Sequence, residues 1–229
     1  MRKLIATVAG LTLMAFAGTA QAALIDNGGF EITDGRLGSA NNNALNALGS
    51  SSPTWDVYTS LPGTSGDSWT TTIGPGIEVQ YTGTVVPAFE GNHYVELDSH
   101  GATNTNSRME QTVNLAGNTG YTLSFAYRPR TTQTNDNGIA FDVVNGALVG
   151  SSVTGVGPQN WQIVTFDFTS GAAGAHTIGF QAIEADNTLG GFIDDIKLTR
   201  QVPEPATLGL MGAGIFGIGL AARRRRRTV

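Results

Sequence analysis

The feature that most constrains the fold is a strict alternation of side-chain type between Tyr121 and Arg128. Every second residue of this stretch is aromatic or leucine, and the residues between are polar or small. Successive side chains of a strand point to opposite faces, so this pattern predicts a strand with one buried face. Further strands are predicted over 24–31, 77–82, 94–98, 109–113, 139–144, 161–168, 176–183 and 191–199.

About nine short strands bounded by turn residues predict an all-β domain, an antiparallel two-sheet sandwich that a Greek-key crossing would make a jelly roll. The 31 glycines of the chain suit such a fold. Residues 34–53 are polar and are predicted to form a long loop. The predicted core consists of Phe30, Val79, Leu97, Val113, Leu123, Phe125, Phe141, Phe166, Phe168, Ile178, Phe180, Ile196 and Leu198.

The N-terminus has the three parts of a secretory signal peptide. A basic Arg2-Lys3 pair precedes an apolar run over 4–17, and Ala20 and Ala22 form an A-x-A cleavage site. This order predicts export, removal of residues 1–22 by signal peptidase and a mature chain that begins at Ala23. The alternative is an N-terminal membrane anchor, for which the apolar run is short.

The C-terminal segment has three parts in order: the stiff Pro203-Glu204-Pro205 stretch, an uncharged run over 206–222 and a cluster of arginines over 223–227. Such a run followed by arginines predicts a helix in the inner membrane with a cytoplasmic basic end. As a helix, the fifteen residues from Leu208 to Ala222 would cover only about 22 Å of a hydrocarbon core of about 30 Å, and a start at Ala206 adds little. This length favours temporary retention over permanent anchorage. The candidate sorting and processing residues are Pro203, Glu204, Pro205, Arg223, Arg224, Arg225, Arg226 and Arg227.

This tail, residues 202–229, resembles the PEP-CTERM sorting signal of Gram-negative bacteria, because Pro-Glu-Pro, a short apolar helix and an arginine cluster follow in that order. The resemblance implies transient retention in the inner membrane and cleavage by an exosortase. It also implies release to the cell surface or to an exopolysaccharide and biofilm matrix. An ordinary single-span tail anchor is the alternative.

Residues 23–201 are the size of one domain, and the chain has no cysteine. An exported fold without disulfides must depend on a packed core or a bound ion. Six Lys and Arg oppose seventeen Asp and Glu between residues 23 and 200, a net charge of −11. An acidic domain is a poor binder of nucleic acid or anionic lipid. This charge suits calcium, a neutral glycan or solubility alone.

Carboxylates in the first and last predicted strands suggest an ion site. In the last strand Phe192, Asp194, Ile196 and Leu198 are expected to share a face, which places Asp194 at the edge of the core. A buried carboxylate without a partner favours a proton or a cation. The alternative is ordinary strand-end hydrogen bonding. The candidate ligands of a structural Ca²⁺ are Asp26, Asn27, Glu31, Asp194 and Asp195.

The stretches NGGFE, VELDS, QTVNLAGNTGYTLSFAYRPR and FIDDIKL, together with a strand that begins at Trp161, span nearly the whole domain. They resemble the galactose-binding-like jelly roll of bacterial carbohydrate-binding modules. The resemblance implies a structural calcium that joins Glu31 to Asp194.

A glycan site needs aromatic faces for the sugar ring and planar polar groups for its hydroxyls. The alternative for the three tryptophans is simple packing. The candidate ligand-binding residues are Trp55, Tyr58, Trp69, Tyr94, Arg128, Arg130 and Asn135.

Catalytic motifs are weak in this chain. Glu96 and Asp98 could form a carboxylate pair, and Asp98-Ser99-His100 contains the residue types of a triad, although neighbouring strand residues point oppositely.

The leading hypothesis is therefore a non-enzymatic, exported β-sandwich that binds glycan or matrix polymer. A structural matrix protein without a specific ligand and a polysaccharide hydrolase or lyase are the alternatives.

Overall fold

Two six-stranded antiparallel sheets form the domain in the computed structural model, which describes residues 24–101, 105–145, 147–157 and 160–201. The first sheet has the order β1 (Trp55–Tyr58), β4 (Ile77–Tyr81), β5 (His93–Glu96), β12 (Phe192–Arg200), β7 (Gly120–Arg128) and β10 (Gln162–Thr169). The second has the order β2 (Ser60–Gly63), β3 (Gly66–Ile73), β6 (Arg108–Leu115), β11 (Gly174–Ala182), β8 (Ile139–Asn145) and β9 (Ala147–Val153). Within the described ranges the only helix is a 3₁₀ turn, η1 (Leu45–Ala47).

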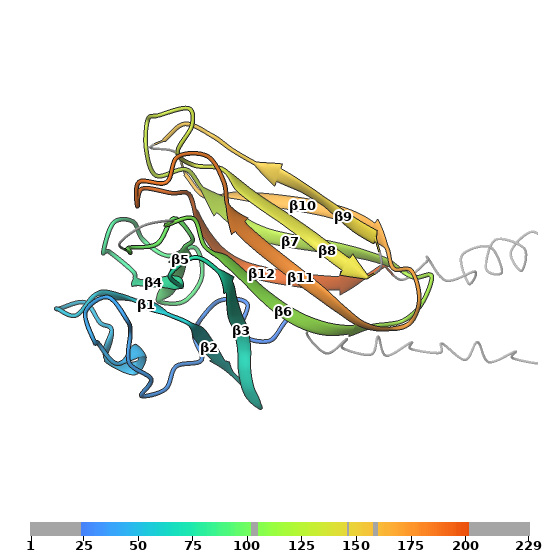
Figure 1. Ribbon diagram of the computed structural model, residues 1–229, viewed down its shortest axis with the longest axis horizontal. Helices are drawn as coiled ribbons and strands as arrows, with labels where there is room; N and C mark the ends of the chain where they lie inside the picture. The colour runs from blue at the N-terminus through green and yellow to red at the C-terminus, as the bar shows by residue number, and fades with distance from the viewer. Residues whose placement is uncertain (1–23, 102–104, 146, 158–159, 202–229) are drawn as a thin grey trace, which may run out of the picture.

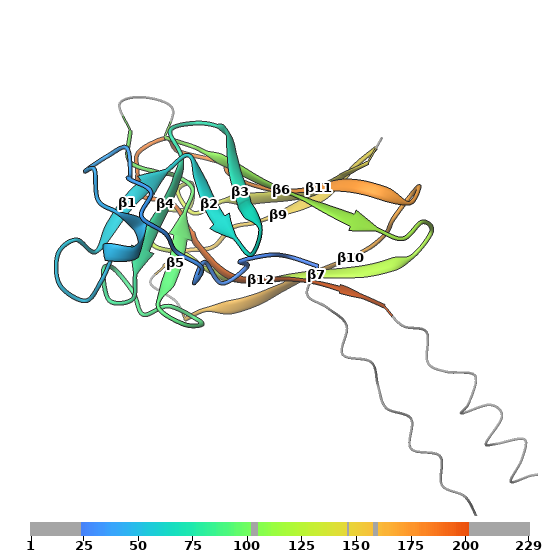
Figure 2. The same ribbon diagram turned by 90° about the horizontal axis from the view of Figure 1, so that it is seen from below.

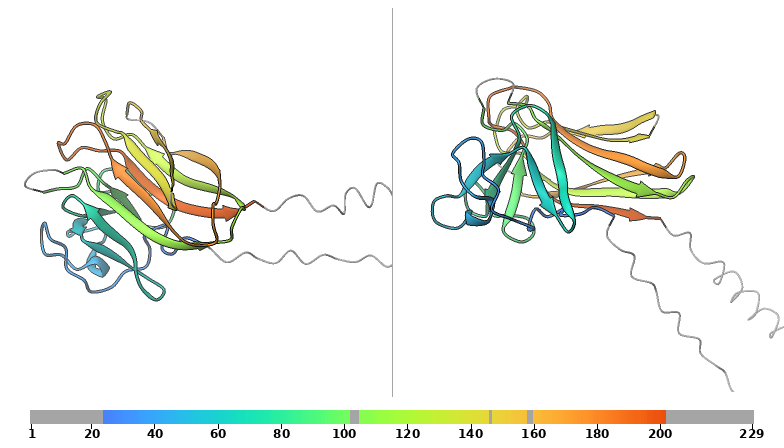
Figure 3. Two further views of the ribbon diagram at one scale, coloured as in Figure 1. Left: turned by 45° about the vertical axis from the view of Figure 1, so that its right-hand side comes forward. Right: turned by 60° about the horizontal axis from the view of Figure 1, so that its bottom comes forward.

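From β5 onward the chain crosses between the sheets repeatedly. β5, β7, β10 and β12 lie in the first sheet, and β6, the β8–β9 hairpin and β11 lie in the second. Figure 2 shows the two layers, with β7, β10 and β12 in one and β6, β9 and β11 in the other. The N-terminal strands lie at one end of the sandwich, beyond which the long strands extend (Figures 1 and 3). The predicted two-sheet jelly roll is confirmed.

The core lies between the two sheets and is rich in aromatic side chains. Phe125 is in edge contact with Phe141 and Phe180, with ring centroids 5.1 and 5.0 Å apart. Of the predicted core residues only Phe166 remains partly exposed, and it still packs against Phe141 at 5.6 Å. Alternating sequence patterns therefore identified the buried face of β6, β7, β8 and β11 correctly.

The strands β1, β2, β3 and β9 were not predicted, and the predicted strand over 24–31 does not form. Asn27 and Phe30 have φ angles of 50° and 62°, which are incompatible with an extended strand. The segment nevertheless lies against the last strand, because the Ile196 amide donates to the Gly28 carbonyl over 2.9 Å. The first and last segments of the domain therefore lie side by side.

A β-bulge interrupts the alternation in β12. The register with β7 shifts between Asp194 and Lys197, and Asp195 has a φ of 50°. An extra residue moves the following side chains to the opposite face. Ile193 and Ile196 thus enter the core, whereas Asp194 and Phe192 face outward, and the prediction that 192, 194, 196 and 198 share one face was wrong.

Both predicted targeting segments lie outside the described residues, including Ala20, Ala22 and the tail 202–229. In the part of the chain that is described, no helix is long and apolar enough to cross a membrane.

Candidate functional site on the outer face of the first sheet

The candidate site is the side of the first sheet that points away from the core, called the outer face below. Strand register sets its side chains in rows, because directly opposite residues share a face. Glu78 pairs with Val57 and with Glu96, and Phe192 pairs with Glu96 and with Arg128. One row therefore runs across five strands through Val57, Glu78, Glu96, Phe192 and Arg128.

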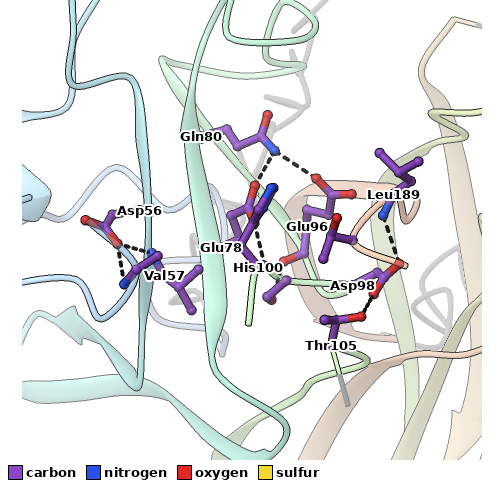
Figure 4. A network of polar contacts seen from close by, with 12 residues as sticks. Asp56, Val57, Glu78, Gln80, Glu96, Asp98, His100, Thr105 and Leu189 are labelled. Atoms are coloured by element: carbon purple, nitrogen blue, oxygen red, sulfur yellow. Dashed lines mark hydrogen bonds and ion pairs between the residues drawn. The ribbon is translucent and has the colours of Figure 1, made fainter. Parts of the chain in front are cut away.

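Two buried carboxylates, Glu78 and Glu96, form the centre of this face. Gln80 Nε2 donates to Glu78 Oε1 and to Glu96 Oε2, each over 2.8 Å. Arg130 Nη1 donates to both oxygens of Glu96 over 2.7 and 2.6 Å. Figure 4 shows Glu78, Gln80 and Glu96 turned toward one another. Because protein donors contact both oxygens of Glu96, this carboxylate orients Arg130.

The surroundings of Glu78 and Glu96 disfavour a negative charge on both carboxylates at once. Burial raises the pKa of Glu96 well above its usual value, and the neighbouring Glu78 carboxylate raises it further, whereas the Arg130 guanidinium acts in the opposite direction. Loss of water around a carboxylate disfavours its charged form, and a like charge nearby adds to that effect. Arg130 is therefore the counter-charge on which an ionised Glu96 depends.

His100 connects the buried carboxylates to the surface. Glu78 Oε2 accepts from the His100 amide over 2.9 Å and lies 2.7 Å from His100 Nδ1. The imidazole stacks at a tilt on Trp55, with ring centroids 4.5 Å apart, and 42% of the His100 side chain remains exposed. A buried carboxylate thus orients a ring pair that solvent can reach.

The Asp98-Ser99-His100 stretch does not form a catalytic triad. Asp98 accepts from the Leu189 amide over 2.9 Å and from the Thr105 hydroxyl, contacts that Figure 4 also shows. Ser99 Oγ donates to the Gly76 carbonyl over 2.6 Å. Because Asp98 and Ser99 make separate contacts with the backbone, their role in this face is to hold loops.

An aromatic cluster covers the outer face beside Glu96. Tyr94 is in edge contact with Phe192 at 5.0 Å and with Trp161 at 6.0 Å, and its hydroxyl donates to Gln80 Oε1 over 2.8 Å. Trp161 also contacts Phe89 at 6.2 Å and donates through Nε1 to the Pro87 carbonyl over 2.8 Å. Phe89 is 42% exposed, so an aromatic surface lies next to the polar network.

The predicted ligand-binding residues fall into two groups. Four of them come together on or beside the outer face: Trp55, Tyr94, Arg128 and Arg130.

The other three lie elsewhere. Trp69 is fully buried in the core, where its Nε1 donates to the Asn27 carbonyl over 3.1 Å. Tyr58 is also buried, which raises its pKa, and its hydroxyl donates to the Asn43 carbonyl over 3.2 Å. Asn135 is exposed, and its carbonyl accepts from the Ala185 amide over 2.8 Å. Their roles in ligand binding stay predictions.

The predicted ion ligands Glu31 and Asp194 meet at one segment, residues 89–93. Glu31 Oε1 accepts from the amides of Asn92 and His93, each over 2.7 Å. Asp194 Oδ2 accepts from the amides of Phe89 and Glu90 over 2.9 and 3.0 Å. Two carboxylates from distant parts of the chain therefore hold the same backbone segment through its N–H groups.

The pKa values of these two carboxylates move in opposite directions. Burial raises the pKa of Asp194 to about 7, against the opposing hydrogen bonds from the amides of Glu90, Asp195 and Phe89. Partial burial also acts to raise the pKa of Glu31, but hydrogen bonds from the His93 ring and from the backbone outweigh it and the pKa is lowered.

The other candidate ion ligands also have protein partners. Asp26 Oδ2 accepts from the Thr64 amide over 2.8 Å, Asn27 donates to the Pro62 carbonyl over 2.8 Å, and Asp195 pairs with Lys197 at 2.7 Å. Among the described residues no three His, Asp or Glu side chains gather as a metal centre. The donor set, as arranged, fits backbone anchoring better than the six to eight oxygens of a Ca²⁺ shell, and calcium binding stays a prediction.

A second polar feature lies on the outer side of the second sheet. It is a depression of about 380 Å³, lined by hydroxyl, amide and carboxylate side chains that include Asp26, Asp67, Thr70, Glu110, Gln111 and Thr112. No aromatic side chain lines it among the described residues. It therefore lacks the apolar face that a sugar ring requires.

Comparison with known proteins identifies the C-terminal segment. Residues 201–226 match the family model described as the PEP-CTERM protein-sorting motif. The chain carries a PEP-CTERM sorting motif. This confirms the prediction made from the Pro-Glu-Pro turn and the arginine cluster, and the motif indicates an exported protein that an exosortase processes. A search of curated proteins finds no match.

Several solved structures share a distant likeness with the domain. TmCBM61, solved in complex with β-1,4-galactotriose, has 20% identity and a TM-score of 0.49, with 79% of this chain and 100% of that chain covered. A CBM4 structure has 19% identity and a TM-score of 0.37, with 77% and 99% covered. A family 35 carbohydrate-binding module from Clostridium thermocellum has 20% identity and a TM-score of 0.37, with 64% and 92% covered.

Sequence reasoning missed several residues of the site. Glu78 and Gln80 were not singled out, His100 was considered only as part of a triad, and Trp161 was recognised only as the start of a strand. The alternation over 77–82 already placed Glu78 and Gln80 on the face opposite the core. The missing information was that loops cover this face, which buries both side chains.

Proposed function

We propose that this PEP-CTERM protein is an exported, non-catalytic polysaccharide-binding protein whose ligand binds on the outer face of the first sheet. The observation that carries the proposal is the solvent-exposed His100 ring, stacked on Trp55 and held by the buried Glu78. Nearby, the Trp161–Phe89 pair adds aromatic surface. Aromatic faces beside oriented polar groups are the combination that sugar rings require.

The contacts of the carboxylates favour binding over hydrolysis. A hydrolase needs one carboxylate to deliver a proton and a second to contact a water or the sugar. Glu96 is fully buried, and both its oxygens accept hydrogen bonds from Arg130. Asp98 is also buried and holds backbone amides. Both carboxylates thus support the shape of the site.

The sorting motif supplies the setting for this binding. An exported chain that is retained in the inner membrane and then cleaved would reach the extracellular polysaccharide of a Gram-negative cell. We infer that this polysaccharide, at the cell surface or in the biofilm matrix, is the ligand.

The test is binding of the full-length chain, solubilised in mild detergent, to the extracellular polysaccharide of its own organism, measured by affinity electrophoresis. Trp55→Ala and Trp161→Ala should each weaken binding about tenfold, the equivalent of roughly 1.4 kcal/mol. Ile73→Ala is the matched control, because Ile73 is 47% exposed but lies in the second sheet. Undiminished binding by both tryptophan variants would contradict the assignment of the site.

A purely structural matrix protein is the second candidate. The burial of Glu78, Glu96 and Gln80 favours it, because the polar network is largely internal and would stiffen the sandwich without any ligand. Absence of polysaccharide binding by the wild-type chain, with matrix cohesion still dependent on the protein, would select this candidate.

A further inference from the structure

Arg128 is exceptional among the basic side chains of the domain. Every other lysine or arginine that is at least partly buried has a carboxylate within ion-pair distance in the described structure, and so does the more exposed Lys197. These pairs are Arg36 with Asp34 and Asp67, Arg108 with Glu110 and Asp142, Arg130 with Glu96, and Lys197 with Asp195. Arg128 has no carboxylate within ion-pair distance among the described residues, although acidic residues outnumber basic ones by seventeen to six between residues 23 and 200.

The guanidinium of Arg128 is also incompletely hydrogen-bonded. Its Nε atom is shielded from solvent and has no hydrogen-bond partner among the described residues, and the residue as a whole is partly buried. A buried donor without a partner costs free energy, and buried polar groups in native proteins are nearly always paired. The position therefore lacks both a hydrogen-bond acceptor and a counter-charge.

The missing partner would lie on the outer face of the first sheet. Arg128 stands opposite Phe192 in the register of β7 and β12, and the register of β7 and β10, extended by one residue, sets Trp161 opposite it. Arg130, two residues further on, lies 5.7 Å above the Phe192 ring and is already neutralised by Glu96. Of the two arginines beside the aromatic cluster, only Arg128 thus lacks a carboxylate partner among the described residues.

We propose that Arg128 receives a carboxylate of the ligand, and that the polysaccharide recognised by this face is an acidic one that contains uronic acid residues. A guanidinium matches a carboxylate through two parallel N–H···O bonds, while the nearby aromatic side chains contact the sugar ring. The inference rests on the proposed function and replaces the neutral glycan expected from net charge.

The overall charge of the domain predicts how salt concentration affects binding of the acidic polymer. A net charge of −11 between residues 23 and 200 repels a polyanion at long range, so attraction must come from the local contact with Arg128. Salt screens the long-range repulsion more than a partly buried contact. Binding of the acidic polymer should therefore persist or strengthen between about 0.05 and 0.3 M salt, unlike adsorption to a basic surface.

The experiment compares two forms of one polymer, the organism's extracellular polysaccharide before and after chemical reduction of its carboxylates to alcohols. The full-length chain should bind the native form at least about tenfold more tightly than the reduced form. Arg128→Gln should lose about 10- to 100-fold of affinity for the native form and little for the reduced form. Arg200→Gln removes an equal charge from an exposed position of β12 and should bind like the wild type.

Three other results of this binding experiment would overturn the acidic ligand. Equal binding of both polymer forms, unaffected by Arg128→Gln, would overturn the acidic ligand and leave polysaccharide binding intact. Equal losses in Arg128→Gln and Arg200→Gln would show general charge attraction and would also overturn it. Binding of neither form would refute the proposed function and this inference together. The melting temperature of Arg128→Gln should equal or exceed that of the wild type, because no internal partner is lost and an unpaired buried donor is removed.

Discussion

Replacement of Arg130 by glutamine should destabilise the protein in a way that depends on pH. Arg130 is the only guanidinium that contacts Glu96 among the described residues, and Glu96 itself is fully buried beside Glu78. Arg130→Gln removes the counter-charge and leaves two buried carboxylates bridged by a single amide, that of Gln80. An uncompensated buried charge is the expected result.

The loss of unfolding free energy in Arg130→Gln follows from the burial of Arg130 and Glu96. Removal of one partner of a buried pair costs about 3 to 5 kcal/mol. Because 18% of the Arg130 side chain is exposed, the lower end, about 3 kcal/mol, applies at pH 8. Burial and Glu78 already raise the pKa of Glu96, and loss of Arg130 raises it further, so Glu96 in the folded variant binds a proton at a pH where the unfolded chain does not.

The sign of the pH effect follows from this raised pKa. The contribution of Glu96 to the free energy of unfolding is greatest below the pKa of Glu96 in the unfolded chain, about 4.3. This contribution falls as pH rises toward the pKa of Glu96 in the folded chain, by up to about 1.4 kcal/mol per pH unit. The cost of Arg130→Gln should therefore decrease to about 1 kcal/mol at pH 5, where Glu96 can be neutral.

Urea unfolding of the full-length chain at pH 5 and pH 8, followed by tryptophan fluorescence, measures both values. The double variant Glu96→Gln/Arg130→Gln is the control, because it removes both charges and should recover most of the loss at pH 8. A cost that is the same at both pH values, or a double variant as unstable as Arg130→Gln, would refute the assignment of Glu96 as the group that titrates.

Three further predictions test the placement of other residues. Trp69→Phe should lower the free energy of unfolding but leave polysaccharide affinity unchanged, because Trp69 is fully buried in the core. Trp55→Ala should weaken polysaccharide binding but leave the free energy of unfolding nearly unchanged, and urea unfolding and affinity electrophoresis measure the two effects separately. Gly28→Ala should cost more than about 2 kcal/mol in urea unfolding, because a Cβ there would lie 2.0 Å from the Ile196 carbonyl oxygen, and a neutral result would contradict the close packing of this segment on β12. If the predicted Ca²⁺ binds, it should raise the melting temperature of the wild type but not of Asp194→Asn, and an unchanged wild-type midpoint in chelator would exclude the ion.

The sequence predicted the fold best where one face of a strand is buried and the other is polar. The stretch 121–128 is such a case, and its alternation identified both the strand and its inward residues. β1 has buried residues on both faces, since Asp56 as well as Val57 is shielded, so the period of two disappears. In β12 the alternation itself was misleading, because the bulge after Asp194 moves Ile196 to the core side.

The site was less predictable because it depends on contacts between distant residues. Glu78 and Glu96 are cross-strand partners, and nothing in their local sequence indicates that pairing. Trp69 and Trp55 have similar polar surroundings in the sequence, yet one packs in the core and the other on the outer face. The exported setting, by contrast, was readable from the tail because its signal is a contiguous motif.

Polysaccharide binding on the outer face of the first sheet should protect the backbone amides that lie there. Hydrogen–deuterium exchange of the full-length chain, with and without the extracellular polysaccharide, tests it directly. With polysaccharide bound, exchange should slow at the backbone amides of 85–93, 98–101 and 128–137, and should not change at 64–72 and 110–112 around the depression of the second sheet. Protection confined to that depression, with none on the outer face, would contradict the claim.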